Sequence, residues 1–516
     1  MVEVIRASSV DTQPRKFKVV RKRLAALSIS SLMAFGYVGA DESFAATTLP
    51  TNRPFATETA QPTDALYPTI SPDLTPIFPL APETTLTPEI EHEPKVLWEV
   101  NAGSGSEPTV AVSPFDSNLV AVTYQHVLHK SGCDLSGVRI SKDGGRKWIN
   151  TEQAPWKGSC PDYHGQVAWG PGPTEGSSRL WWADAMIIGK GKIAAGVTYS
   201  DNLGETWAPL YIEKRTKPWV GGFPDITVDN NKNSPNFGTI YIAYNWLESP
   251  NGPGVSIIAS GDNGKTWQMT QVPAVGLEGY PDYWRIGYRI KAAPDGSAFV
   301  SFYESNLKNW SKNDIFNQGG TSNIGRLGFA TARLNFDRSS KKLTAEPAKW
   351  AISLSKSHLY LPFAPQWQSE LEVDSSGRLF LAVSEYIKKS IVKVGYSDDS
   401  GSSWKWQNIN VKGQSGFKPS LAVKDDQIFV GFPTRDLHGK IKRYYSMSYN
   451  SGESFLEPKP VTPASWNLSS VKEVINGVGL RETADFGADG IVRYAYGDGR
   501  KGNGQVNVFL AAVDPD

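Results

Sequence analysis

One eight-residue motif occurs five times in this chain and limits the folds that it can adopt. Each copy, here called an octet, has a Ser, an Asp or Asn two positions later, a Gly two positions further on, and an aromatic residue at its end. The octets begin at Ser141, Ser200, Ser260, Ser397 and Ser448. Asp or Asn can accept a hydrogen bond from its own backbone, and Gly allows the positive φ that closes a turn. Each octet is therefore predicted to be a turn between two strands.

The spacing of the octets predicts a repeat of about 60 residues. Successive octets start 59, 60, 137 and 51 residues apart, so the long gap holds two units, of which one lacks the octet. A strand–turn–strand pattern that precedes each octet identifies seven units, which begin near residues 107, 164, 223, 287, 368, 418 and 481. A repeat of this length is typical of propellers. We predict an all-β fold, a β-propeller of seven four-stranded blades, with six blades as the alternative.

Two units depart from the pattern. The fourth has Phe336-Asp-Arg-Ser-Ser-Lys-Lys where its octet would lie, and the seventh ends near Val513, where its octet would begin. An early strand at residues 96–100 is expected to pair into the last blade and close the ring, which removes free sheet edges.

The N-terminal region has the composition of an export signal. Basic residues between Arg15 and Arg23 precede an apolar stretch from Leu24 to about Ala40, and small residues follow. We predict a signal peptide at residues 1–45, a Pro- and Thr-rich linker at 46–95 and the propeller at 96–516. An uncleaved membrane anchor is the alternative. The protein is expected to be secreted or displayed at the cell surface, with no membrane span after signal cleavage.

Charge and cysteine content exclude several classes of function. The net charge of +1 offers no basic field for nucleic acid, and we expect no nucleic-acid partner. The two cysteines, Cys133 and Cys160, are predicted to form one disulfide in an exported chain. Two thiols without nearby His do not fit a zinc site, so no metal or other cofactor is expected.

The octets resemble the Asp-boxes, or bacterial neuraminidase repeats, of the sialidase superfamily. The resemblance covers essentially all of residues 96–516. The resemblance implies box turns on the rim away from the active face. It also implies a site with three arginines that hold a carboxylate, an Asp acid/base and a Tyr nucleophile activated by Glu. Some Asp-box proteins are non-catalytic. The first unit begins Glu107-Pro-Thr-Val, without the family's Arg-Ile-Pro, and the nearest string, Tyr288-Arg-Ile-Lys291, lies in the fourth unit.

Alternate residues of each inner strand are expected to face the channel of the propeller. The first level comprises Glu107, His164, Phe223, Gly287, Gln368, Lys418 and Arg481. The second comprises Thr109, Gln166, Asp225, Arg289, Glu370, Ser420 and Thr483, and the third Ala111, Ala168, Thr227, Lys291, Glu372, Ala422 and Asp485. Charged residues gather in the third to fifth units, either as a site or as ion pairs that hold the blades in register.

These levels and the loops before them supply the candidate site residues. A glycosidase needs a carboxyl that protonates the leaving oxygen and a second group across the sugar ring. The catalytic candidates are Asp225, Asp282, Glu370 and Tyr283; the substrate-binding candidates are Arg289, Arg481, Arg285, His164 and Trp284. Asp282 and its aromatic neighbours are equally consistent with an ordinary turn. Trp181 and Trp182, expected in or beside connecting segments, are further candidates for stacking on sugars.

The leading hypothesis is a sialidase-like propeller that acts on or recognises extracellular glycans, with glycoside hydrolysis as the reaction if it is an enzyme. The alternative is a non-catalytic binding or assembly module of the cell envelope, with a cell-surface protein as partner. A purely structural surface protein is a third possibility. We expect a monomer in each case.

Overall fold

The computed structural model describes residues 92–125, 136–150, 159–161, 165–188, 192–209, 211–213, 224–246, 254–273, 283–307, 324–354, 368–386, 389–471, 481–502 and 504–516. The predicted signal peptide, nearly all of the linker, and Cys133 with its predicted disulfide lie outside these residues. The regular structure in the described part is β-strand, apart from one 3₁₀ turn, η3 (Leu468–Ser470). No helix in this part is long and apolar enough to cross a membrane.

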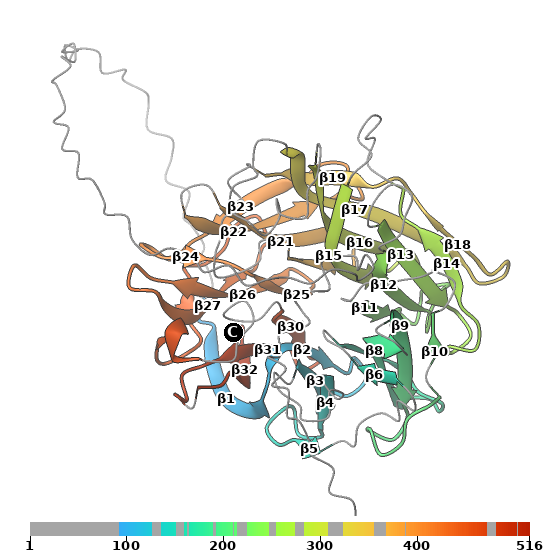
Figure 1. Ribbon diagram of the computed structural model, residues 1–516, viewed down its shortest axis with the longest axis horizontal. Coiled ribbons are helices and arrows are strands. Elements are labelled where there is room, and N and C mark those ends of the chain that lie inside the picture. Colours follow the sequence, from blue (N-terminus) through green and yellow to red (C-terminus); the bar gives the residue numbers. More distant parts are fainter. Residues whose placement is uncertain are drawn as a thin grey trace, which may run out of the picture. The chain divides into compact units, whose positions relative to one another are not determined.

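The strands form seven antiparallel sheets in a ring, so the predicted seven-bladed β-propeller is confirmed (Figure 1). Blade 1 contains β2 (Ser106–Val112), β3 (Val120–Gln125), β4 (Ser136–Ser141) and β5 (Ile149–Asn150). Blade 2 contains β6 (Ser159–Pro161), β7 (Gln166–Pro171), β8 (Ser178–Ile188), β9 (Lys192–Ser200) and β10 (Tyr211–Ile212). Blade 3 contains β11 (Asp225–Val228), β12 (Ile240–Trp246), β13 (Gly254–Ser260) and β14 (Gln268–Gln271).

The remaining blades follow in chain order. Blade 4 contains β15 (Tyr283–Ala292), β16 (Ala298–Leu307), β17 (Ile324–Asp337), β18 (Lys342–Ala345) and β19 (Lys349–Ser353). Blade 5 contains β20 (Ser369–Val373), β21 (Leu379–Tyr386), β22 (Ser390–Ser397) and β23 (Lys405–Ile409). Blade 6 contains β24 (Ser415–Gly416), β25 (Ser420–Lys424), β26 (Gln427–Arg435), β27 (Lys440–Ser448), β28 (Lys459–Pro460) and β29 (Trp466–Asn467). Blade 7 contains β30 (Thr483–Phe486), β31 (Val492–Asp498), β32 (Asn507–Asp514) and β1 (Lys95–Ser104).

Some of the four strand positions of a blade are occupied by two short segments. Strands β6 and β7 both pair with β8, and β18 and β19 both pair with β17. In blade 6 the inner position is divided between β24 and β25, and the outer position between β28 and β29. The four-stranded plan is therefore kept in every blade.

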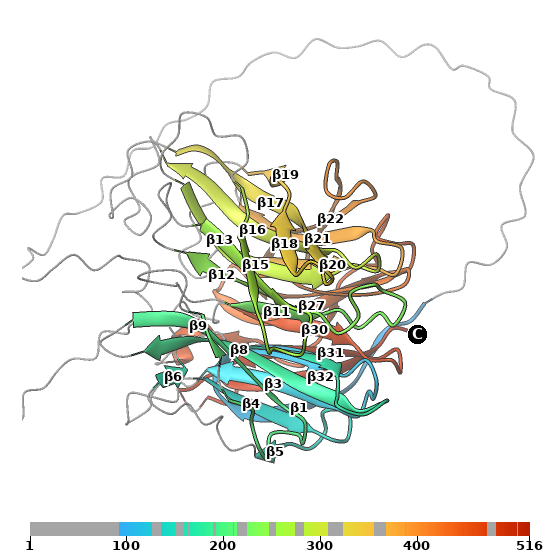
Figure 2. The ribbon, with the colours of Figure 1, turned by 90° about the vertical axis from the view of Figure 1, so that its right-hand side faces the viewer.

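The N-terminal strand closes the ring, as predicted. Strand β1 pairs antiparallel with β32, from Lys95 opposite Asp514 to Ser104 opposite Asn507, and supplies the outer strand of blade 7. The two strands lie side by side in Figure 1 and in the side view of Figure 2. The seventh unit needs no octet, because its outer strand comes from the other end of the propeller.

Seven apolar clusters hold the blades together, one at each contact between neighbouring blades. The contact of blades 3 and 4, for example, buries Tyr241, Ile257, Tyr288 and Val300. The contact of blades 7 and 1 buries Val110, Val122 and Leu510 and thereby completes the ring. Trp181 and Trp182 do not lie beside a connecting segment, since β8 places both in such clusters, at blade contacts 2–3 and 1–2.

All five octets adopt the same turn, stabilised by the same three hydrogen bonds. In the fifth-blade copy, Ser397 Oγ donates to Asp399 Oδ1 (2.8 Å) and accepts from the Gly401 N–H (2.9 Å), while Asp399 Oδ1 accepts from the Ser403 N–H (2.8 Å). Gly401 has a φ of 81°, as predicted, and the preceding Ser400 is also left-handed, at 55°. In the fourth blade, Asp337 instead accepts hydrogen bonds from Ser339 and Ser340.

We expect Asp399→Ala to lower the thermal unfolding midpoint by a few degrees, because it removes the shared acceptor of the turn. Asp399→Asn should lower it less, since Asn202 and Asn450 accept the same hydrogen bonds in their octets. The exposed Asp426→Ala is the matched control. Equal losses in the Ala and Asn variants would contradict this account.

The same comparison should depend on pH. Hydrogen bonds from Ser403 and Ser397 lower the pKa of Asp399 from 3.8 to about 2. The stabilisation by this charge is therefore complete above the unfolded pKa and lost as the pH falls from about 4 to about 2. The difference in thermal unfolding midpoint between the wild type and Asp399→Asn should become smaller over that pH range.

Candidate functional site

A cavity of about 210 Å³ lies in the channel between the inner strands. Six inner strands line it: β2, β7, β11, β15, β20 and β30. Each inner strand contacts the next one round the ring, and β30 contacts β2. The ionisable residues of the lining are Asp225, Arg289, Lys291, Glu370, Glu372 and Asp485, all at positions that alternation had predicted to face the channel.

Two ion pairs join blades 4 and 5 across this cavity. Arg289 Nε donates to Glu370 Oε1 (2.7 Å), its Nη2 contacts the same oxygen, and its Nη1 donates to the Tyr288 carbonyl (2.8 Å). Lys291 Nζ lies 2.7 Å from Glu372 Oε1. Burial alone would lower the pKa of Arg289, but the charge of Glu370 leaves it raised. Burial also raises the pKa of Glu370, against the effect of Arg289.

Other polar side chains of the lining bind the main chain of a neighbouring inner strand. Asp225 Oδ2 accepts from the Ile290 N–H (2.8 Å), and Asp485 Oδ2 accepts from the Val112 N–H (2.7 Å). Thr483 Oγ1 accepts from the Val110 N–H (2.7 Å). Because the inner strand is the edge of its blade, its outward N–H groups need such partners. These side chains therefore link blade 3 to blade 4 and blade 7 to blade 1.

Two polar atoms of the lining have no hydrogen-bond partner among the described residues. Gln166 Nε2 is a buried donor on blade 2, and its residue is only 5% exposed. Asn230 Oδ1 is a buried acceptor that follows β11 on blade 3, although Asn230 Nδ2 donates to the Trp169 carbonyl. Buried polar atoms are nearly always satisfied, so a donor and an acceptor without partners in one cavity suggest a bound ligand or water.

The exposure of the channel side chains increases along the inner strands. The side chain of Arg289 is 3% exposed and that of Lys291, two residues later, is 34% exposed. Glu370 and Glu372 follow the same trend, at 7% and 15%. Burial raises the pKa of the Glu372 carboxyl to about 7, although Lys291 opposes the shift. The cavity is thus open at the C-terminal ends of the inner strands, where Lys291 and Glu372 lie.

The level before the cavity is filled by buried side chains. Glu107, Gln368, Lys418 and Arg481 are all at most 5% exposed. Glu107 and Lys418 have positive φ values of 54° and 48°, which are strained for non-glycine residues. Arg481 Nη1 reaches from blade 7 to the Pro224 carbonyl of blade 3 (3.1 Å). Burial, and then the charge of Arg289, lower the pKa of Arg481 to about 9.

The other predicted site residues are distributed differently. Arg285 donates to Glu304 Oε2 (3.1 Å) and to the Val272 carbonyl (3.0 Å), so it lies at the contact of blades 3 and 4. Tyr283 and Trp284 belong to β15 and pair with β16 instead of lying in a loop. His164 and Asp282 lie outside the described residues. Within the described part, no group of three His, Cys, Asp or Glu side chains could hold a metal ion.

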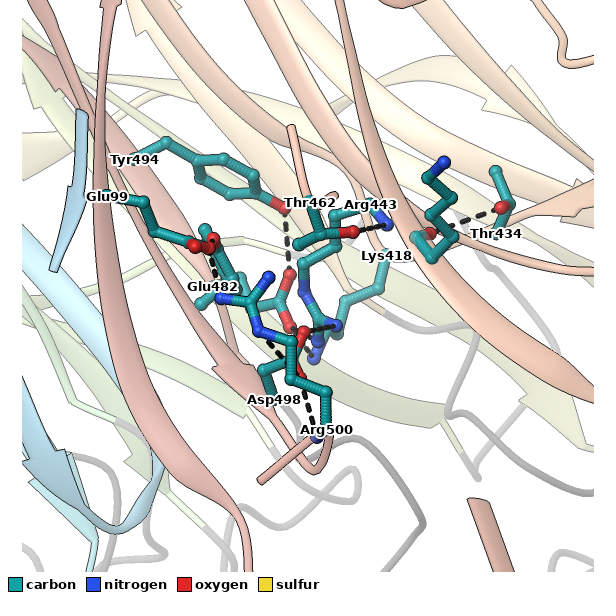
Figure 3. A network of polar contacts seen from close by, with 11 residues as sticks. Glu99, Lys418, Thr434, Arg443, Thr462, Glu482, Tyr494, Asp498 and Arg500 are labelled. Atoms are coloured by element: carbon teal, nitrogen blue, oxygen red, sulfur yellow. Dashed lines mark hydrogen bonds and ion pairs between the residues drawn. The ribbon is translucent and has the colours of Figure 1, made fainter. Parts of the chain in front are cut away.

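A second polar cluster, which the sequence did not reveal, lies between blades 6 and 7 (Figure 3). Glu482 accepts from Arg443 Nη2 (2.6 Å) and the Tyr494 hydroxyl (2.9 Å) and lies 3.2 Å from Lys418 Nζ. Arg443 also contacts Asp498 (3.5 Å). Burial favours the neutral form of Glu482, but Arg443 and Lys418 bring its pKa below the ordinary value.

This cluster contains a Tyr–Glu pair beside an arginine, yet its side chains are almost completely buried. The Arg443, Glu482 and Lys418 side chains are 0%, 0% and 1% exposed. Glu482 lies between two channel positions, so alternation did not predict that it would face the channel. A charged residue at a position of this kind, on the side of the strand that is buried, was the signal that could have identified it. The cluster connects blades and does not open on the cavity.

No family model matches the sequence, and no curated protein matches it. Among solved structures, an ulvan lyase of polysaccharide lyase family PL25 has a TM-score of 0.47 and 10% identity, over 80% of this chain and 95% of that one. The Hadza microbial sialidase Hz136 has a TM-score of 0.41 and 14% identity, over 77% and 74%. YCF48 bound to a D1 peptide has a TM-score of 0.38 and 11% identity, over 83% and 97%. Likenesses this distant carry no argument about activity.

We expect Glu482→Gln to destabilise the protein by about 3–5 kcal/mol, because it leaves Arg443 and Lys418 buried without their carboxylate. Denaturant unfolding measures the change. The pair Lys95–Asp514, whose lysine is exposed, provides the control, and Lys95→Gln should change stability by less than about 1 kcal/mol. A loss of unfolding free energy in Glu482→Gln as small as that in the control would show that the cluster is not needed for stability.

Proposed function

We propose that this chain is a secreted or cell-surface protein that recognises a glycan through the channel cavity, without cleaving it. The observation that carries the proposal is the pair of unpartnered atoms, Gln166 Nε2 and Asn230 Oδ1, in the wall of the cavity. A sugar hydroxyl both donates and accepts hydrogen bonds, so it can satisfy a donor and an acceptor of this kind. Export is supported by the composition of residues 1–45.

The paired charges favour recognition over catalysis. Arg289 and Glu370 bond to each other, and Asp225 bonds to the backbone of the next blade. A clamp arginine or a catalytic carboxylate instead needs its bonding groups directed at the substrate. In the cavity, these side chains fix the shape of the wall to which a ligand binds.

A panel of neutral, amino, N-acetylated and acidic sugars, titrated by calorimetry, tests the proposal. The wild type should bind at least one sugar saturably, and Gln166→Leu should bind it roughly 10-fold more weakly, a loss of about 1.4 kcal/mol. Gln407→Leu, on the outer strand β23, is the matched control and should bind like the wild type. Saturable binding of no sugar, or unchanged binding by Gln166→Leu, would overturn the proposal.

Glycoside hydrolysis is the second candidate, favoured by one observation. The pKa of Glu372, raised to about 7, keeps a proton available near neutral pH in a cavity that also contains Asp225 and Asp485. A protonated carboxyl opposite an ionised one is the arrangement that glycosidases use. In this scheme Arg289 orients the sugar, Glu372 donates the proton, and Asp225 or Glu370 is the carboxylate across the ring.

Release of sugar from fluorogenic glycosides, sialosides included, separates the two candidates. Recognition without cleavage predicts no turnover above the uncatalysed rate. Turnover by the wild type that falls at least about 100-fold in both Asp225→Asn and Glu370→Gln would establish the hydrolase instead. Gln407→Leu again serves as the control for handling and folding.

A further inference from the structure

The channel cavity has more acidic than basic groups. Its lining contains four carboxyl side chains, Asp225, Glu370, Glu372 and Asp485, against two basic ones, Arg289 and Lys291. Even with Glu372 protonated, three carboxyl groups remain against two basic ones, so the ionised cavity holds an excess of negative charge. In a partly desolvated site such an excess attracts cations and opposes the entry of anions.

The excess negative charge of the cavity is carried by Asp225 and Asp485. Arg289 is paired with Glu370 and Lys291 with Glu372, whereas neither of the two aspartates has a cationic nitrogen within 4 Å in the described part of the chain. Each accepts a hydrogen bond from a backbone N–H, which carries no net charge. Burial raises the pKa of Asp485, against the charge of Lys291, as expected for an incompletely neutralised carboxylate.

The cavity is small and opens at one end of the channel. Its volume, about 210 Å³, is below the range of about 300–1,000 Å³ for drug-sized ligands, so it suits a single small polar unit. Lys291 and Glu372 mark the open end. Neighbouring strands of a blade are antiparallel, so the first and third strands run the same way. The octets, which follow third strands, therefore lie at the open end, and the expectation that they lie on the rim away from the site does not hold for this cavity.

We propose that the cavity binds a sugar with a free ammonium group, an unacetylated amino sugar, which enters from the octet end and presents its cation to Asp485 and Asp225. This inference rests on the proposed function and names its ligand class. The ammonium neutralises the excess carboxylates, and the hydroxyls of the sugar pair with Gln166 and Asn230. An N-acetyl group removes the charge, and an acidic sugar adds repulsion.

Calorimetry with glucosamine, N-acetylglucosamine, glucose and glucuronic acid at pH 7 and fixed ionic strength tests the inference. Glucosamine should bind at least roughly 10-fold more tightly than N-acetylglucosamine or glucose, and glucuronic acid should bind most weakly. Higher salt should weaken glucosamine binding and leave glucose binding nearly unchanged.

The isosteric variant Asp485→Asn removes the charge but keeps an oxygen that can accept from the Val112 N–H. It should lose most of the preference for glucosamine over glucose, measured as the ratio of the two affinities in the variant and in the wild type. Asp426→Asn, which removes an exposed charge from blade 6, is the matched control. Because Asp485 also connects two blades, the thermal midpoint of each variant is measured, and Glu372→Gln provides a second carboxylate variant that leaves the Val112 contact intact.

The outcomes separate this inference from the proposed function. Equal affinities for glucosamine, N-acetylglucosamine and glucose, with binding still dependent on Gln166, would overturn the inference and leave glycan recognition standing. Ethanolamine, a small amine that is not a sugar, is the final probe. Binding of ethanolamine that Asp485→Asn abolishes, with no sugar bound, would overturn both glycan recognition and the amino-sugar assignment and would show a site for small cations instead. Absence of binding by all five compounds would overturn both.

Discussion

Closure of the ring by β1 and β32 is the constraint on which the rest of the structure depends. Each blade buries one face against the next, so seven apolar contacts form only when the first and last blades also meet. The pairing of Lys95–Ser104 with Asn507–Asp514 joins the two ends of the propeller within one blade. Without it β32 would be a free edge, and the seventh blade would lack its outer strand.

The closed ring in turn forces polar groups into the centre. Seven inner strands converge there, and their edge N–H groups must be satisfied by side chains of the neighbouring blades. Asp225, Thr483 and Asp485 do so, while Arg289 and Lys291 form ion pairs with Glu370 and Glu372. Gln166 and Asn230 are left with unpartnered atoms. The channel is therefore a structural element, and these two atoms of its wall are the ones to which we propose that a ligand binds.

Much of this arrangement could be predicted from local sequence patterns. The octets predicted the five turns because the hydrogen bonds of Ser and of Asp or Asn join residues only two or four positions apart. Alternation along the inner strands predicted which residues face the channel, since the period of a strand is independent of its neighbours. The pairing of Arg289 with Glu370 could not be predicted in the same way. It connects residues 81 positions apart, and it depends on how blades 4 and 5 are offset relative to each other along the channel.

The places where prediction failed share a physical cause. Trp181 and Trp182 were expected beside connecting segments, and Tyr283 and Trp284 in a loop, but the strands β8 and β15 extend through them. Strand length is decided by pairing with a neighbour, which a single segment does not reveal. Glu482 lies between two channel positions, and its burial depends on Arg443 and Lys418 of the neighbouring blade and on the Tyr494 hydroxyl.

The sequence by itself determined the repeat, the turn chemistry and the alternation of channel and core residues, because each of these is a pattern along the chain that does not depend on which blades meet. It predicted seven blades with six as the alternative, and the ring of seven sheets decided between them. Only the tertiary structure decided which charges neutralise one another, which carboxylates remain in excess and which end of the channel is open. Those properties depend on distances between different blades and on the exclusion of water, and they arise only when the ring is closed.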